Sequence, residues 1–194
     1  MKKNLKAILL LVGFVLFPNI VHADNITPIY GNKLTWNIES IYYYLDGNST
    51  QYSSIIASAA NNWVYTGYGY NKLYPNTRIY DITGTAVDFK TYSQSDNVIA
   101  ETFFFTRANG TGPAETVNPR YSNWLFSEIK INTTKFDTLS EYNKIGSIAH
   151  EFGHAWGLAH HNNNRESIMC QLGYYRMVNT VQQVDQDAFN SIYY

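Results

Sequence analysis

The chain has 194 residues, of which 14 are Lys or Arg and 15 are Asp or Glu, so its formal net charge is −1. Three of the basic residues lie within the first 23 positions, and the remainder therefore carries 11 basic and 15 acidic side chains, a net charge of −4. This balance excludes the basic surface expected of a nucleic-acid-binding protein. The single cysteine, Cys170, excludes an intramolecular disulfide, and we expect it to be a small buried residue.

The first 23 residues have the pattern of a secretory signal peptide. Lys2, Lys3 and Lys6 give a positively charged start, residues 7–17 form an apolar run, and Val21-His22-Ala23 supplies the small residues that a signal peptidase accepts. The alternative is an uncleaved membrane anchor, but 11 residues are too few for a helix to cross a hydrocarbon core of roughly 30 Å. We therefore expect export, and a mature protein that starts at Asp24.

Residues 24–194 are long enough for one domain with a sizeable core, and they contain no internal repeat. The order of the expected elements is strand, helix, several strands and then helices, which favours an α+β fold with a mixed sheet. Hydrophobic periodicity and turn residues place helices at 49–65, from a capping box at Thr138-x-x-Glu141 onward, and at 180–192. They place strands at 36–45, 78–82, 86–92, 98–105 and 124–132.

The residues that carry chemistry lie in the segment HEFGHAWGLAH, from His150 to His160. In a helix, His150 and His154 are four residues apart and project from one face, where two neutral imidazoles can bind one Zn²⁺. Gly157 stands where a helix end commonly needs a left-handed residue, and the chain can then return to bring in His160. Three protein ligands leave a fourth zinc position for water, which is typical of a catalytic site.

Glu151 is adjacent to the first ligand and cannot easily bind the same ion. It can instead remove a proton from a water activated by the zinc, and later deliver that proton to the leaving amine of a cleaved peptide. The structural alternative is a pair of histidines on a solvent-facing helix stripe. The complete motif makes that alternative weak, because its chance occurrence in such a chain is on the order of one in 100,000.

Downstream of His160, the segment Ser167-Ile168-Met169 adds a second element. Together with the extended histidine motif, it resembles the metzincin clan, in which a turn with a methionine lies beneath the metal; Met169 matches that residue. Within the clan, the sequence from His150 to Leu158 looks most like the matrixin (matrix-metalloprotease-like) catalytic domains. The resemblance extends more weakly over residues 36–194. It implies a twisted, mostly parallel five-stranded sheet with an active-site helix, a C-terminal helix and a cleft between two subdomains.

Several positions depart from the matrixin pattern. His161 follows the third ligand where matrixins usually have Ser, and we expect it to be exposed or to support a ligand. Gln171 stands where related families have a tyrosine that approaches the zinc, and Tyr174 or Tyr175 is a weak candidate for that role. No cysteine-switch segment is recognisable, and neither a second zinc nor a calcium site can be assigned, although calcium remains possible.

The resemblance also suggests how a substrate is held. Residues 98–105 are expected to form the sheet edge beside the cleft, so that an extended peptide could add a strand to it. Substitution of Phe104 or Phe105 is then expected to raise the Michaelis constant for peptides. The segment from Gln171 to Tyr175 is expected to wall the pocket for the residue after the scissile bond, and its composition hints at an apolar preference.

The sequence thus predicts a secreted, zinc-dependent endopeptidase that acts as a monomer on proteins or peptides, without nucleic acid or stable membrane association. One alternative is an exported, non-catalytic binding module with a zinc site, which would not need Glu151. Another is a zinc peptidase of a different clan with a distant Glu as third ligand, which the position of His160 disfavours.

Overall fold

In a computed structural model of the chain, the described residues are 26–68, 76–77 and 84–194. The proposed signal peptide and the strand expected at 78–82 lie outside them. The described residues contain no helix that is both long enough and apolar enough to cross a membrane.

The core of the fold is a six-stranded sheet in the order β2-β1-β3-β6-β4-β5. The strands are β1 (Tyr42–Leu45), β2 (Asn76–Thr77), β3 (Val87–Tyr92), β4 (Ala100–Arg107), β5 (Ala114–Thr116) and β6 (Phe126–Asn132). The neighbouring strands β2, β1, β3 and β6 are mutually parallel. Strand β4 is antiparallel to β6, and β5 is antiparallel to β4. The predicted α+β fold with a mostly parallel sheet is therefore confirmed, with the two-residue β2 and the short β5 at its margins.

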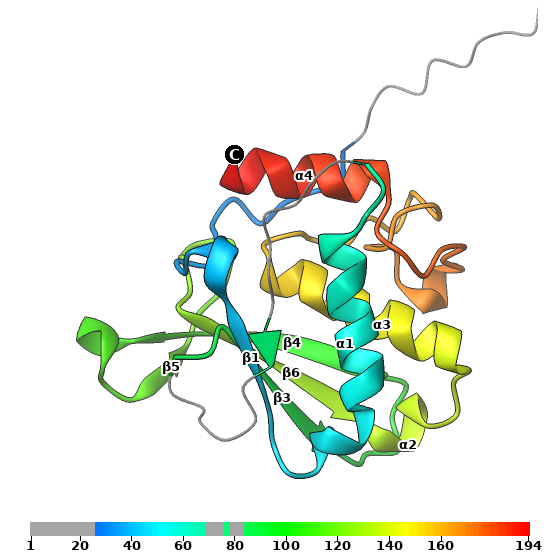
Figure 1. Cartoon of the computed structure of the whole chain (residues 1–194), viewed down its shortest axis with the longest axis horizontal. Coiled ribbons are helices and arrows are strands. Elements are labelled where there is room, and N and C mark those ends of the chain that lie inside the picture. The colour runs from blue at the N-terminus through cyan, green and yellow to red at the C-terminus, as the bar shows by residue number, and fades with distance from the viewer. Residues whose placement is uncertain (1–25, 69–75, 78–83) are drawn as a thin grey trace, which may run out of the picture.

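Four α-helices accompany the sheet in the described part of the chain: α1 (Ser53–Val64), α2 (Thr133–Phe136), α3 (Glu141–Ala155) and α4 (Gln183–Tyr193). Short 3-10 turns occur at Ile38–Ser40, Ser49–Tyr52, Ala108–Gly110 and Leu172–Tyr174. Helices α1 and α3 lie side by side over one face of the sheet, and α4 lies at one end of the molecule (Figure 1). The active-site and C-terminal helices that the resemblance implied are thus present.

The two faces of the sheet differ in chemistry, which explains why the helices cover only one of them. Phe152 of α3 packs edge-on against Phe89 and Tyr43, with ring centroids 5.3 and 6.1 Å apart. On the opposite face, Glu128 pairs with Lys90 and Lys130. Glu128 itself is buried, whereas the side chains of Lys90 and Lys130 are 40 and 37 % exposed, so this face carries a charged cluster in place of a packed apolar layer.

Two sequence predictions about element ends are wrong. The helix expected to start at a Thr138 capping box begins at Glu141, because Ser140 caps it by accepting a hydrogen bond from the backbone N–H of Asn143. The hydroxyl of Thr138 instead donates to the carbonyl of Lys135. The strand expected from residue 36 begins only at Tyr42, since Asn37 caps the preceding 3-10 turn.

Candidate metal centre and substrate cleft

Helix α3 carries the first two histidines of the motif. His150 and His154 project from the same face of the helix, with their ring centroids 4.7 Å apart. The opposite face is anchored by Phe152 in the sheet core and by the indole N–H of Trp63, which donates to the carbonyl of Ala149 at 2.9 Å. The helix is thus fixed in rotation, and the two imidazoles face the cleft.

The third histidine reaches the same point because the helix ends at a glycine with positive φ. Gly157 has a φ of 108°, which L side chains rarely adopt, so the predicted left-handed helix end is observed. The Nε2 atoms of His154 and His160 lie 3.0 Å apart, and one ligand atom from each of the three histidines lies within 4.8 Å of the others. Two imidazoles on a tetrahedral zinc place their nitrogens about 3.3 Å apart, so this donor set suits that ion.

Backbone carbonyls fix the tautomers of the two helical histidines. Nδ1 of His150 lies 2.8 Å from the carbonyl oxygen of Ile168, and Nδ1 of His154 lies 2.8 Å from that of Leu158. Because a carbonyl only accepts, each Nδ1 carries the hydrogen and each Nε2 keeps its lone pair for a metal. Burial lowers the pKa of all three imidazoles, that of His154 to about 3, so they stay neutral as ligands must.

Glu151 lies beside this cluster, and its carboxylate is held by a residue that sequence reasoning missed. Thr102 of β4 donates its hydroxyl to Oε2 of Glu151 at 2.7 Å. Burial raises the pKa of Glu151 to about 7, although the Thr102 hydrogen bond and the charge of Arg176 act in the opposite direction. Thr102 lies in a strand whose sequence does not mark it, and only the packing of β4 against α3 identifies it.

Met169, which the resemblance places beneath the metal, packs closely against Gly153 of α3. A Cβ on Gly153 would stand 2.3 Å from the sulfur of Met169, so only glycine at this position lets the helix and the methionine turn approach so closely. This contact accounts for a glycine inside a helix, which otherwise costs about 1 kcal/mol relative to alanine. Cys170, which follows, is fully buried, as predicted.

The N-terminal segment at residues 28–30 packs onto the loop that carries the third histidine. Ile29 forms a β-bridge with Leu158, and the backbone N–H of Ala159 donates to the carbonyl of Pro28 at 2.7 Å. The hydroxyl of Tyr30 lies 3.0 Å from Nδ1 of His154. These contacts could not be predicted, because a short turn-rich segment has no periodicity that would indicate its partner.

His161 is buried, with 3 % of its surface exposed, so the expectation that it could be exposed is wrong. Its Nδ1 lies 3.1 Å from the hydroxyl of Thr27, which donates at 2.6 Å to the carboxylate of Asp185 in α4. The same carboxylate accepts from the hydroxyl of Ser167 and from the backbone N–H of Ile168. His161 therefore ties the third-ligand loop to the N-terminal segment and to α4.

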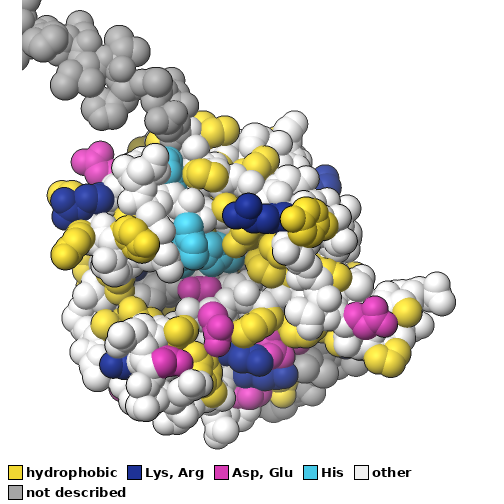
Figure 2. Space-filling model, turned by 180° about the vertical axis from the view of Figure 1, so that it is seen from behind, with side chains coloured by type: hydrophobic (Ala, Val, Ile, Leu, Met, Phe, Trp, Pro, Cys, Tyr) yellow, Lys and Arg dark blue, Asp and Glu magenta, His cyan; other side chains and the backbone are white. Residues whose placement is uncertain are grey.

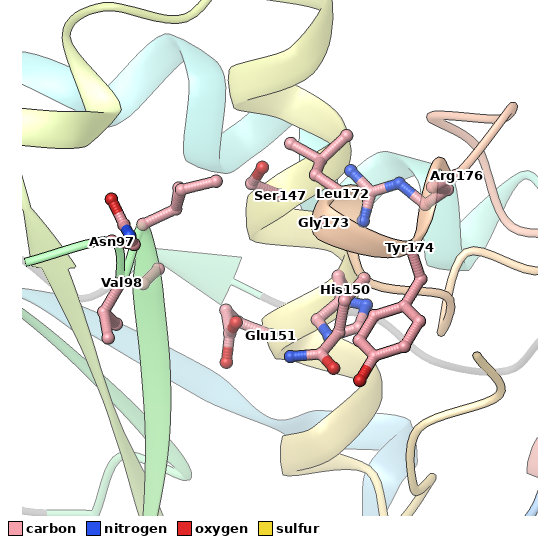
Figure 3. A pocket seen from close by; sticks show the side chains of 12 residues that line it. Asn97, Val98, Ser147, His150, Glu151, Leu172, Gly173, Tyr174 and Arg176 are labelled. Carbon is pink, nitrogen blue, oxygen red and sulfur yellow. The ribbon is translucent and has the colours of Figure 1, made fainter.

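Along α3 from the histidines, a cavity of about 350 Å³ opens between the helix, the N-terminal end of β4 and the loop after Met169. Figure 3 shows Ser147, Glu151 and His150 along the helix, with Asn97 and Val98 on the opposite wall and Tyr174 near His150. The predicted wall-forming segment does line it, through Gln171, Leu172, Gly173 and Tyr174. A space-filling view shows histidine side chains gathered in a hollow of this face, with an acidic side chain beside them (Figure 2).

The free edge of β4 borders this cavity, but the two phenylalanines proposed for substrate binding do not line it. Pairing with β5 starts only at Phe105, so the strand from Ala100 to Phe103 is paired on its β6 side alone within the described residues. Phe104 is a core residue, 7 % exposed, and packs edge-on against Trp124. Phe105 stacks on Phe126, away from the cavity. The prediction that their substitution tests peptide binding is corrected accordingly: the backbone of β4 remains the relevant feature.

Comparison with known families agrees with this geometry. The family model described as Matrixin matches residues 30–194, most of the chain and all of the described site. The chain belongs to the matrixin family. The three histidines that could hold a metal ion, His150, His154 and His160, all lie within the matched residues.

Other comparisons add little to this assignment. No curated protein matches the chain significantly. Among solved structures, that of myroilysin aligns with a TM-score of 0.38 at 15 % identity, over 66 % of this chain and 52 % of that chain. The aligned region thus spans about half the length of myroilysin.

Proposed function

We propose that the chain is a secreted zinc endopeptidase in which His150, His154 and His160 hold the metal and Glu151 is the general base. The observation that carries the proposal is the arrangement of three imidazole ligand atoms within 4.8 Å of one another, with the Glu151 carboxylate on the next residue of the same helix. In this proposal residues 1–23 are the signal peptide, residues 24–194 form one catalytic domain, and the domain acts as a monomer.

A zinc ion in this site would supply a Lewis acid that polarises the peptide carbonyl and lowers the pKa of water. The chain's own residues then divide the remaining work. Glu151 takes a proton from the attacking water and passes it to the leaving amine. Thr102 orients the carboxylate for both transfers through its 2.7 Å hydrogen bond. The carbonyls of Ile168 and Leu158 keep the two helical imidazoles in the metal-binding tautomer.

An extended peptide would dock along β4, where Ala100 to Phe103 offer an open strand edge. Backbone hydrogen bonds to such an edge give affinity with little dependence on sequence, whereas side-chain pockets select residues. One pocket is the 350 Å³ cavity beside α3. A second hollow, on the other side of His160, is lined by Tyr30, Arg120 and Tyr121 among others. Because such an edge and such pockets bind residues of an extended peptide, we expect the enzyme to cut within a chain and not at its end.

The test is digestion of an unstructured protein such as casein by the purified protein. Four samples are compared: wild type, wild type with a zinc chelator, the chelated sample with zinc restored, and Glu151→Gln. We expect cleavage only in the first and third, and a loss of at least about 100-fold in Glu151→Gln, because a general base contributes about that much or more. Bound zinc, measured by mass spectrometry of the metal, should remain at one per chain in Glu151→Gln.

Glu141→Gln is the matched control, because Glu141 is an exposed carboxylate in the first turn of the same helix. It should cleave as the wild type does. His154→Ala should lose zinc as well as activity. If the wild type binds one zinc and cuts no protein under any condition, the endopeptidase proposal fails, and the non-catalytic zinc-binding module takes its place.

A further inference from the structure

The cavity beside α3 is lined by polar and charged side chains as well as by apolar ones. Val98, Ile99 and Leu172 provide apolar walls. Ser147, one turn before His150 on α3, and Arg176, from the loop after Met169, also line the cavity. In Figure 3 the Arg176 side chain extends from the loop toward the part of α3 that carries Ser147. A cationic group therefore lies against a pocket whose walls are otherwise largely neutral.

The Arg176 side chain is half-buried, and the carboxylates of Glu151 and Asp185 act on its charge from a distance without forming an ion pair with it. Its guanidinium makes two long contacts of 3.4 Å to the carbonyls of Ile168 and Cys170 and one hydrogen bond of 3.0 Å to the side-chain oxygen of Asn179. All three acceptors are neutral, and within the described residues Arg176 forms no ion pair. Its Nε–H has no hydrogen-bond partner, although the atom is buried. A half-buried charge in such surroundings carries a desolvation cost that an anion can offset.

Ser147 repeats this pattern on the opposing helix. Its side chain is buried, and its hydroxyl has no hydrogen-bond partner. Buried polar atoms of this kind are rare in folded proteins, and each one calls for an explanation such as an absent ligand. Two unsatisfied donors, one from α3 and one from the loop after Met169, line the same cavity, and an acceptor brought by the substrate would satisfy both.

Arg176 is also held in place, which distinguishes it from a mobile surface arginine. Asn179, its hydrogen-bond partner, donates in turn to Asn143 of α3 at 3.0 Å. A Cβ on Gly146 would stand 1.9 Å from the Asn179 side-chain oxygen, so the glycine makes room for this arrangement. The guanidinium is thus positioned before any ligand arrives, a condition that favours affinity and selectivity.

We propose that this pocket selects a glutamate side chain at the residue that follows the scissile bond, with Arg176 as the specificity-determining residue and Ser147 as a second donor. The inference rests on the proposed endopeptidase function and replaces the apolar preference suggested by the sequence. The apolar walls accept the methylene groups of glutamate, and its carboxylate supplies a direct ion-pair partner. Glutamate fits better than aspartate, because the Glu151 carboxylate lines the mouth of the same cavity and repels an anion held close to it.

The experiment uses zinc-loaded protein and fluorogenic peptides that differ only at the position after the scissile bond: Glu, Gln, Asp or Leu. Glu and Gln have nearly the same shape, so their comparison isolates the charge. We expect kcat/KM for the Glu peptide to exceed that for the Gln peptide by about 10-fold or more, because charge-assisted hydrogen bonds are roughly twice as strong as neutral ones. The Asp peptide should fall below the Glu peptide. A further peptide carries Gln at the tested position and Glu two residues later, which keeps net charge constant.

Variants of Arg176 assign the preference to this residue. In Arg176→Met the ratio of kcat/KM for the Glu peptide to that for the Gln peptide should fall to about 1. Arg176→Lys keeps the charge but not the planar fork of donors, so part of the preference should remain. Should Arg176→Met fail to fold, the wild-type ratio and the Arg176→Lys variant still decide the question.

A binding measurement separates this inference from the proposed function. The same peptides, labelled with a fluorophore, are titrated with zinc-loaded Glu151→Gln, and anisotropy reports the Kd without turnover. Tighter binding of the Glu peptide by about 10-fold supports the inference even if the wild type cleaves nothing, in which case only the endopeptidase proposal fails. The inference would be overturned if the Glu and Gln peptides were bound and cleaved equally well. It would also be overturned if the peptide with Glu two residues later were preferred as strongly as the Glu peptide, or if no peptide bound.

Discussion

Two clusters of buried polar side chains meet at Ile168, and they differ in how completely their hydrogen bonds are satisfied. The backbone N–H of Ile168 donates to the carboxylate of Asp185, and its carbonyl accepts from His150 and from Arg176. On the Asp185 side, two hydroxyls and two backbone N–H groups all donate to the carboxylate. On the Arg176 side, a guanidinium N–H and the Ser147 hydroxyl have none. A satisfied cluster serves the fold, whereas an unsatisfied one beside a cavity indicates a ligand.

The Asp185 cluster joins three segments that are distant in the sequence. Its carboxylate accepts from Thr27 and Ser167 at 2.6 and 2.5 Å, and from the backbone N–H groups of Ile168 and Gln182 at 2.9 and 3.1 Å. The last of these is half of the capping box that starts α4. One buried carboxylate thus fixes the N-terminal segment, the methionine turn and the C-terminal helix around the third-ligand loop.

The largest effect is expected from Asp185→Ala, which removes the acceptor that the satisfied cluster shares. Two backbone N–H groups lose their partner in a buried place, at about 1–3 kcal/mol each, so we expect the free energy of unfolding to fall by about 3 kcal/mol or more. Chemical denaturation measures it. Asp187→Ala, an exposed carboxylate two residues further along α4, is the control and should change stability by less than about 0.5 kcal/mol. Similar losses in both variants would show that the cluster is not what stabilises this region.

A smaller effect is expected from Thr27→Val, which keeps the shape of the side chain and removes one hydroxyl. That hydroxyl bridges Asp185 and His161, so its loss should lower the free energy of unfolding by about 1–2 kcal/mol. The N-terminal segment should also detach more readily, which limited proteolysis near Tyr30 would detect. Thr50→Val is the matched control, because the Thr50 hydroxyl is exposed and bonds only to the carbonyl of Gly47. Equal stability of the two variants would contradict the role given to Thr27.

The features that the sequence alone could predict are those that depend on neighbouring residues. The histidine motif and the turn methionine were predictable, because ligand spacing on a helix and a glycine at its end follow from local geometry. Gly157 has the positive φ that its place in the motif requires. The class of fold followed from the order of strand-like and helical segments, since those patterns depend on neighbours in the sequence.

The remainder depends on contacts between distant segments. Thr102 is separated from Glu151 by 49 positions, and Thr27 from Asp185 by 158, so no local pattern links them. The start of α3 was misplaced because Thr138-x-x-Glu141 fits a capping box as well as Ser140 fits a simple cap, and only the fold decides between them. Arg176 lies in an irregular loop, where neither period nor motif says which way a side chain points.

The smallest effect on stability is expected from Arg176→Met, in the cluster whose hydrogen bonds are incomplete. The substitution loses one good hydrogen bond, to Asn179, but it also removes a half-buried charge that forms no ion pair within the described residues. Because replacing such a group by an apolar one of similar length is often neutral, we expect the free energy of unfolding to change by less than about 1 kcal/mol. Ser147→Ala should behave in the same way, since its hydroxyl has no partner to lose. Thermal and chemical denaturation of both variants beside Asp185→Ala measure the contrast. A loss of more than about 2 kcal/mol in Arg176→Met would show that this arginine stabilises the fold as Asp185 does, and the two clusters would then no longer differ in kind.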